Sequence, residues 1–148
     1  MPRIRDTFGP DGCIVRIRVG LTSVEVLKRR RVGQVLPAPV ELHALIDPGA
    51  EVSCVDPSAI RPIGPPAKTV IPTNAPSVSG LSFSVQRSVA LTILDPQQAP
   101  RNNIFFPDAT LTELSLNTVS LQALIGRELL AHGVFVFDGP AGQFTLTY

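Results

Sequence analysis

Proline and glycine interrupt this chain at short intervals. The sequence of 148 residues contains fifteen Pro and eleven Gly, and both residues disfavour the interior of a helix. Between these breaks, short segments alternate apolar and polar side chains, which is the pattern of a half-buried β-strand. We therefore expect the chain to fold from many short strands joined by turns rather than from long helices.

The alternating segments predict roughly eight to ten strands. A turn is expected at Gly20–Leu21, a proline-rich loop follows Asp56, and one short helix is expected at Arg127–His132, ended by Gly133. Strict strand–helix–strand alternation is absent, so a parallel doubly wound sheet is not expected. The predicted fold class is an all-β, barrel-like domain. The expected strands lie within residues 13–20, 22–31, 39–47, 51–56, 69–94, 103–107 and 134–148.

The charge pattern argues against nucleic-acid and membrane partners. The formal net charge is +1, too small to steer the protein to a charged surface. The charge is uneven, since residues 1–40 carry eight basic and three acidic side chains. The sequence has no signal-peptide pattern and no apolar run near the ~18 residues of a membrane span. Cys13 and Cys54 are too few for a disulfide framework, so we expect free thiols and a soluble, cytoplasmic protein.

Several chemistries are excluded by missing motifs. The sequence has no phosphate-binding glycine loop, no dinucleotide fingerprint, no zinc-protease motif and no G-x-S-x-G elbow. Two histidines and two scattered cysteines do not make a zinc site. His43 lies within an expected strand and His132 in the last turn of the expected helix, so both are interpreted as structural or solvated residues. No cofactor or metal is expected, and carboxylates remain as candidate catalytic groups.

The stretch "ALIDPGAEVS", Ala44 to Ser53, places a carboxylate at the end of an apolar strand and then turns sharply. Asp-Pro-Gly is common turn chemistry, because an aspartate side chain can bond to the backbone two residues on. Asp47 therefore either caps an ordinary turn or is placed there as a catalytic carboxylate.

Two motifs in this sequence resemble the signatures of the retroviral-type (retropepsin-like) aspartic proteases. "ALIDPGAEVS" resembles their active-site loop, and "ALIGRELL", Ala123 to Leu130, resembles their second signature, a Gly-Arg pair followed by a short helix. The order of elements also agrees, because a hairpin with a polar tip lies between the two motifs. The resemblance covers about residues 13–148, which are expected to form the protease domain, and leaves residues 1–12 as an N-terminal extension.

The resemblance implies a homodimeric aspartic endopeptidase, a two-fold pair of closed β-barrel subunits. Asp47 would be catalytic in the active-site loop with Pro48, Gly49 and Ala50. Two copies of Asp47 would share one proton and activate a water, without a metal. Gly126 would pack under the loop, and Arg127 would pair with Glu51. The implied flap tip over a peptide substrate is Asn74, Ala75, Pro76, Ser77, Val78, Ser79 and Gly80.

Pro48 departs from the family pattern, which has Thr or Ser at this position. Proline offers neither a hydroxyl nor an N–H to the opposing loop of a dimer, although its fixed φ stiffens the turn. The first alternative is therefore a catalytically impaired, peptide-binding module with the same fold. The second is a small nucleic-acid-binding barrel that uses Lys28–Arg31, disfavoured because aromatic residues for base stacking are scarce.

Overall fold

The computed structural model of the chain describes residues 1–73, 82–116 and 120–148. Its helices are short: α1 (Ser23–Arg31), α2 (Pro57–Ile60), α3 (Arg127–Leu130) and a 3-10 helix, η1 (Pro100–Asn102). Its strands are β1 (Arg3–Thr7), β2 (Ile14–Gly20), β3 (Val40–Ile46), β4 (Cys54–Val55), β5 (Ala67–Thr73), β6 (Ser82–Ile93), β7 (Ile104–Glu113), β8 (Ala123–Ile125), β9 (Val134–Asp138) and β10 (Gln143–Thr147).

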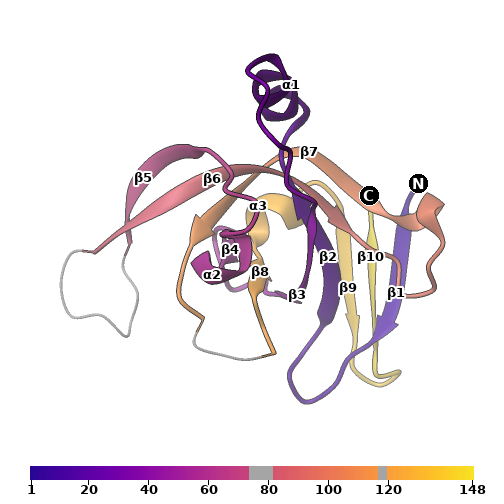
Figure 1. Ribbon diagram of the computed structural model, residues 1–148. Coiled ribbons are helices and arrows are strands. Elements are labelled where there is room, and N and C mark those ends of the chain that lie inside the picture. Colours follow the sequence, from indigo (N-terminus) through magenta and orange to yellow (C-terminus); the bar gives the residue numbers. More distant parts are fainter. Residues whose placement is uncertain (74–81, 117–119) are drawn as a thin grey trace.

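Six strands close into a barrel, which confirms the predicted fold class (Figure 1). They pair in the order β2-β3-β8-β4-β7-β6, and β6 returns to β2 through the register Ile17↔Ile93 to Gly20↔Ala90. The sheet is mixed, because β3 pairs with β8 and β4 pairs with β7 in parallel. Among the described strands, β5 pairs only with β6 and extends this sheet beyond the barrel.

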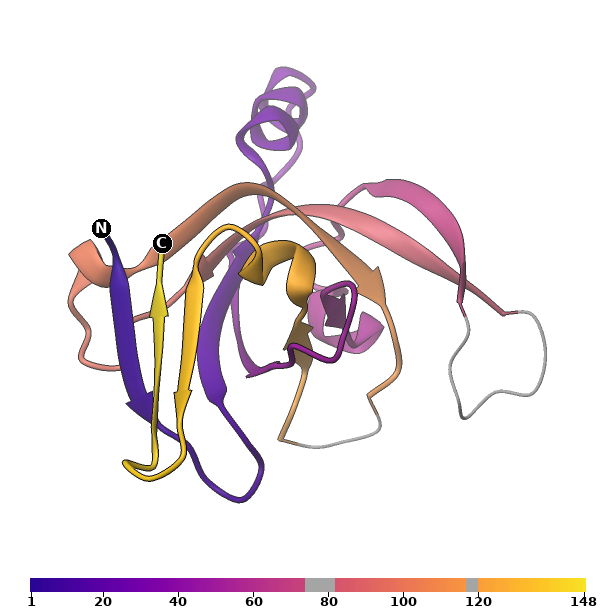
Figure 2. The same cartoon turned by 180° about the vertical axis from the view of Figure 1, so that it is seen from behind.

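A second sheet of three strands, in the order β1-β10-β9, lies beside the barrel (Figure 2). Ile4, Phe144 and Leu146 from this sheet are fully buried and belong to the same core as the barrel side chains. β9 and β10 are the two strands of the predicted closing hairpin. Residues 1–12, expected as an extension, supply β1, which pairs with β10 along its length. The first residues of the chain are therefore part of this sheet.

The structure corrects the prediction for residues 22–31, which form helix α1 instead of a strand. Val24 and Val26 produce the misleading alternation, but the Thr22 hydroxyl accepts the backbone N–H of Glu25 at 3.3 Å and caps the helix. A Thr followed three residues later by Glu is the signature of a capping box. The capping signal therefore outweighs the two β-branched residues.

Helix α2 is a second correction, since residues 57–60 were expected to be loop. Asp56 caps this helix by accepting the backbone N–H of Ser58 at 3.0 Å, and Pro57 stands at its first position. Proline is favourable there because the first N–H groups of a helix have no partner inside it. The predicted helix α3 is confirmed at Arg127–Leu130. No helix in the described part of the chain is long and apolar enough to cross a membrane.

Candidate active site

Asp47 follows β3 directly, at the point where β3 and β8 end side by side. The last register pair of these parallel strands is Ile46↔Ile125. The backbone N–H of Asp47 donates to the carbonyl oxygen of Ile125 at 2.9 Å. Ile46 and Ile125 are both buried in the core. The half-buried Asp47 is therefore held in a fixed position at the ends of these two core strands.

The residues after Asp47 form a tight turn around its carboxylate. The backbone N–H of Gly49 donates to Asp47 Oδ1 at 2.9 Å, and that of Ala50 donates to the Asp47 carbonyl at 3.1 Å. The predicted turn chemistry is therefore present. A Cβ at position 49 would lie 3.0 Å from Asp47 Oδ1, which is tighter than ordinary contact. Gly49 thus allows the carboxylate to approach the turn closely.

Pro48 is exposed at the second position of this turn, a position where proline's fixed φ is favourable. The turn takes its hydrogen bonds from the N–H groups of Gly49 and Ala50. The N–H that Pro48 lacks is therefore not needed to close the loop within the chain. The effect of Pro48 on contacts between two copies stays a prediction.

The second motif crosses the loop that follows Asp47 and is bonded to it. The N–H of Gly126 donates to the hydroxyl of the fully buried Ser53 at 2.8 Å, and the N–H of Arg127 donates to the Ala50 carbonyl at 2.9 Å. A Cβ on Gly126 would lie 2.5 Å from the carbonyl carbon of Val52. Only glycine fits at this crossing without movement of the backbone.

The carboxylate that supports the loop is Glu128, which the sequence analysis did not select. Glu128 Oε1 accepts the backbone N–H of Ser53 at 2.7 Å, and its Oε2 is buried without a hydrogen-bond partner among the described residues. The expected pair of Glu51 with Arg127 is not among the ion pairs of the described residues, and both side chains are exposed. Glu128 follows Arg127 at the start of α3, but residue spacing alone does not distinguish it from Glu51.

Cys54 lies close to the carboxylates of this site. Burial raises the pKa of the Cys54 thiol to about 11, and the nearby charges of Glu128 and Asp47 add to that effect. The thiol therefore stays protonated and donates a weak hydrogen bond to the Val52 carbonyl. Cys13 is also a buried free thiol, as expected. Within the described residues, no group of His, Cys, Asp or Glu side chains could hold a metal ion.

The hairpin that was interpreted as a flap is partly described. Its arms are β5 and β6, which pair from Ala67↔Arg87 to Thr73↔Ser82. The predicted tip, Asn74 to Gly80, lies outside the described residues. His43 and His132 are both exposed, which agrees with their interpretation as structural or solvated side chains.

Comparison with solved structures identifies the fold. A retropepsin-like aspartic protease from Rickettsia conorii matches over 99% of this chain and 91% of that chain, with a TM-score of 0.56. The chain has the retropepsin-like fold. The sequence identity is 13%, so the likeness concerns the fold alone. No family model matches the chain, and no curated protein matches it. Within this retropepsin-like fold, Asp47 and the Gly126–Glu128 segment form the candidate active site.

Proposed function

We propose that the chain is an aspartic endopeptidase in which two copies each supply one Asp47 to a shared site. The observation that carries this proposal is that backbone hydrogen bonds fix the position of the Asp47 turn. Its turn is bonded to the ends of β8 and α3 through Ile125 and Arg127, inside a retropepsin-like fold. A site fixed on strands and supported by a second layer of hydrogen bonds suits a group that must be placed accurately.

The chemistry needs no group beyond two carboxyls and one water. Two carboxylates held close share a single proton, because both cannot be ionised together. The ionised Asp47 takes a proton from the water. At the same time, the water oxygen attacks the peptide carbonyl carbon. The protonated Asp47 gives its proton to the carbonyl oxygen. As the resulting diol collapses and the C–N bond breaks, one hydroxyl proton of the diol passes to the ionised carboxylate and the leaving nitrogen takes the proton of the other carboxyl, so the pair again holds one proton.

The proposed substrate is an extended peptide segment flanked by apolar residues. The β5–β6 hairpin would cover it as a flap, with the tip that the resemblance assigns to residues 74–80. Because one shared proton is required, cleavage is expected to be faster at mildly acid pH. Activity also requires association of two copies, so it should fall when the protein is diluted below its dissociation constant.

The test is cleavage of a mixed peptide library between pH 4 and pH 7. We expect the natural chain to cleave and the Asp47→Asn variant to be inactive. Asp138→Asn is the matched control, because Asp138 also accepts a backbone N–H in a turn, from Ala141 at 3.1 Å. Sedimentation of the same samples reports whether they are dimeric. Equal cleavage by Asp47→Asn and by the natural chain would reject the proposal.

A second candidate function is peptide binding without cleavage, and Pro48 is the observation that favours it. Lacking a hydroxyl and an N–H, Pro48 cannot make the cross-dimer hydrogen bonds that the family makes at this position. Each lost bond costs ~1 kcal/mol, and two-fold symmetry doubles the number lost. The interaction between the two Asp47 loops of a dimer would therefore be weaker by several kcal/mol. A dimer that binds library peptides but cleaves none would support this function instead.

A further inference from the structure

Helix α1 stands away from the barrel, in the connection between β2 and β3 (Figure 1). The structure describes the whole helix, and none of its nine residues is buried. Leu27 is 55% exposed and Val24 75% exposed. A helix that added only stability would bury an apolar face against the barrel. The exposed apolar side chains of α1 therefore call for another explanation.

A groove of about 520 Å³ runs between α1 and the barrel strands β6 and β7. Phe105 and Pro107 of β7 form one side of it, and Leu27 of α1 forms the other. Phe105 is 61% exposed, a high value for a side chain of its size. The lining is Leu21, Ser23, Val26, Leu27, Arg30, Ala90, Phe105 and Pro107.

One basic residue, Arg30, is among the residues that line this groove. Arg30 is exposed and takes part in no ion pair within the described residues, and the same holds for Lys28 and Arg31 of the same helix. The only acidic residue of the helix, Glu25, forms an ion pair with Arg29 at 2.8 Å. Cations do complement the C-terminal end of a helix. That effect does not account for the exposed apolar surface beside them.

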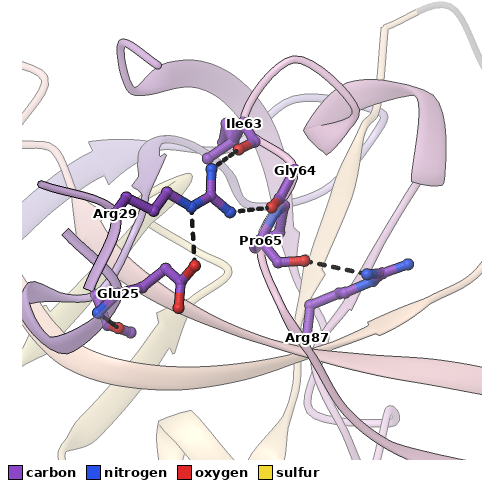
Figure 3. Close-up of polar contacts among 7 residues, drawn as sticks. Glu25, Arg29, Ile63, Gly64, Pro65 and Arg87 are labelled. Carbon is purple, nitrogen blue, oxygen red and sulfur yellow. Dashed lines mark hydrogen bonds and ion pairs between the residues drawn. The ribbon is translucent and has the colours of Figure 1, made fainter. Parts of the chain in front are cut away.

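Side-chain hydrogen bonds of Arg29 tie α1, which forms one side of the groove, to the loop before β5 (Figure 3). The guanidinium of Arg29 donates to the carbonyl oxygen of Gly64 at 2.6 Å and to that of Ile63 at 3.4 Å. From the other side of the same loop, Arg87 of β6 donates to the Pro65 carbonyl at 3.0 Å. A surface that is already ordered loses less entropy when a ligand binds to it.

We propose that this groove, lined by Leu27, Arg30 and Phe105, binds an acidic, apolar peptide segment of a partner protein. Apolar side chains of the segment fill the space between Leu27 and Phe105. A carboxylate beside them pairs with Arg30, as charge complementarity requires. The inference does not depend on Asp47 or on proteolysis.

Two features favour a peptide over other acidic partners. The site is concave and walled by a strand, whereas a lipid surface is contacted by the convex apolar face of an amphipathic helix. Among the lining residues, Phe105 is the only aromatic one, so the groove offers a single stacking surface where single-stranded nucleic acids use several.

The experiment is selection of a phage-displayed library of random twelve-residue peptides on the natural protein. Enriched peptides should combine Asp or Glu with Leu or Phe. Their affinities, measured by fluorescence anisotropy, should fall at least about tenfold for Arg30→Glu and for Leu27→Ser, since charge-assisted contacts and buried apolar anchors each contribute this much. Binding should also weaken with added NaCl.

Matched controls separate this groove from other surfaces. Arg101→Glu reverses an exposed arginine on η1, and Val136→Ser replaces an exposed apolar residue on β9. Both should bind the selected peptides as the natural protein does. The proposal is overturned if no acidic, apolar peptides are enriched, or if they bind Arg30→Glu and Leu27→Ser unchanged. Cosedimentation with phosphatidylserine vesicles or binding of an oligonucleotide, without peptide binding, would overturn it in favour of those partners.

Discussion

Glu128 and Ser53, far apart in the sequence, are joined by a hydrogen bond of 2.7 Å from the Ser53 N–H to Glu128 Oε1. The Ser53 hydroxyl in turn accepts the Gly126 N–H at 2.8 Å. Ser53 is thus bonded on both sides to the segment that enters α3. These two bonds connect the residue just before β4 to the segment that enters α3.

Removing the Glu128 carboxylate should loosen this connection. We expect Glu128→Ala to lower the free energy of unfolding by about 1–3 kcal/mol, because the buried Ser53 N–H loses its charged acceptor. Glu128→Gln keeps an oxygen in place and should cost less. Urea unfolding of the two variants measures the difference. Equal free energies of unfolding for Glu128→Ala and the natural protein would show that this bond does not stabilise the fold.

Substitution of Gly126 by alanine should be destabilising for a steric reason. The new Cβ would lie 2.5 Å from the Val52 carbonyl carbon and 2.7 Å from its oxygen, and neither backbone atom can move alone. Overpacking of this kind costs typically about 1–3 kcal/mol. Gly9→Ala is the control, because no atom lies within 4 Å of the Cβ added there. Urea unfolding should show a loss for the first variant and almost none for the second.

Arg29 should determine how firmly α1 is attached. It is the α1 residue that bonds to the Ile63 and Gly64 carbonyls, so Arg29→Gln should raise amide hydrogen exchange across residues 23–31. Arg30→Gln removes an exposed neighbour that makes no ion pair within the described chain. It should leave exchange in the helix nearly unchanged. Slow exchange in both variants would mean that other contacts hold the helix.

Stability should fall as the pH rises above 9. Burial is the largest cause that raises the pKa of Cys54 from 9.0 to about 11, so between these values the thiol ionises in the unfolded chain and not in the folded one. The unfolded state then binds fewer protons, and its population increases with pH. Tyr148, whose pKa is raised mainly by burial from 10.0 to about 12, extends the effect upwards.

The variant that checks this is Cys54→Ser, whose hydroxyl does not titrate in this range. Its free energy of unfolding, measured in urea under reducing conditions from pH 8 to pH 11, should change less steeply than that of the natural protein. Tyr148→Phe should flatten the curve only above about pH 10. Parallel curves for all three proteins would contradict the assignment.

The sequence was most informative where alternation and turn residues agreed. Val15, Ile17 and Val19 of β2 and the apolar residues of β9 and β10 form strands as predicted. It was misleading at α1, where the β-branched Val24 and Val26 imitate a strand and only the Thr22–Glu25 spacing indicates a helix. Strand β1 was missed because residues 1–12 were treated as an extension, and its pairing with β10 is a contact between distant parts of the chain.

The structure joins the Asp47 loop to the segment around Gly126 by hydrogen bonds. At the candidate site, the sequence predicted roles for Asp47, Gly49 and Gly126 through local motifs, and those roles stay predictions. It could not select the carboxylate beneath them. Glu51 and Glu128 are both close in sequence to a motif, but only the direction in which α3 leaves Gly126 brings Glu128 to the Ser53 N–H. Such a choice depends on the three-dimensional course of the backbone, which residue spacing does not specify.

The pairing of β1 with β10 brings the two ends of this sequence close together (Figure 2). The Tyr148 N–H donates to the Pro2 carbonyl at 3.1 Å. The first and the last strand of this sequence are thus neighbours in one sheet. A circular permutant, with residue 148 linked to residue 1 and new ends opened at the exposed Gly33, would keep every strand of both sheets intact.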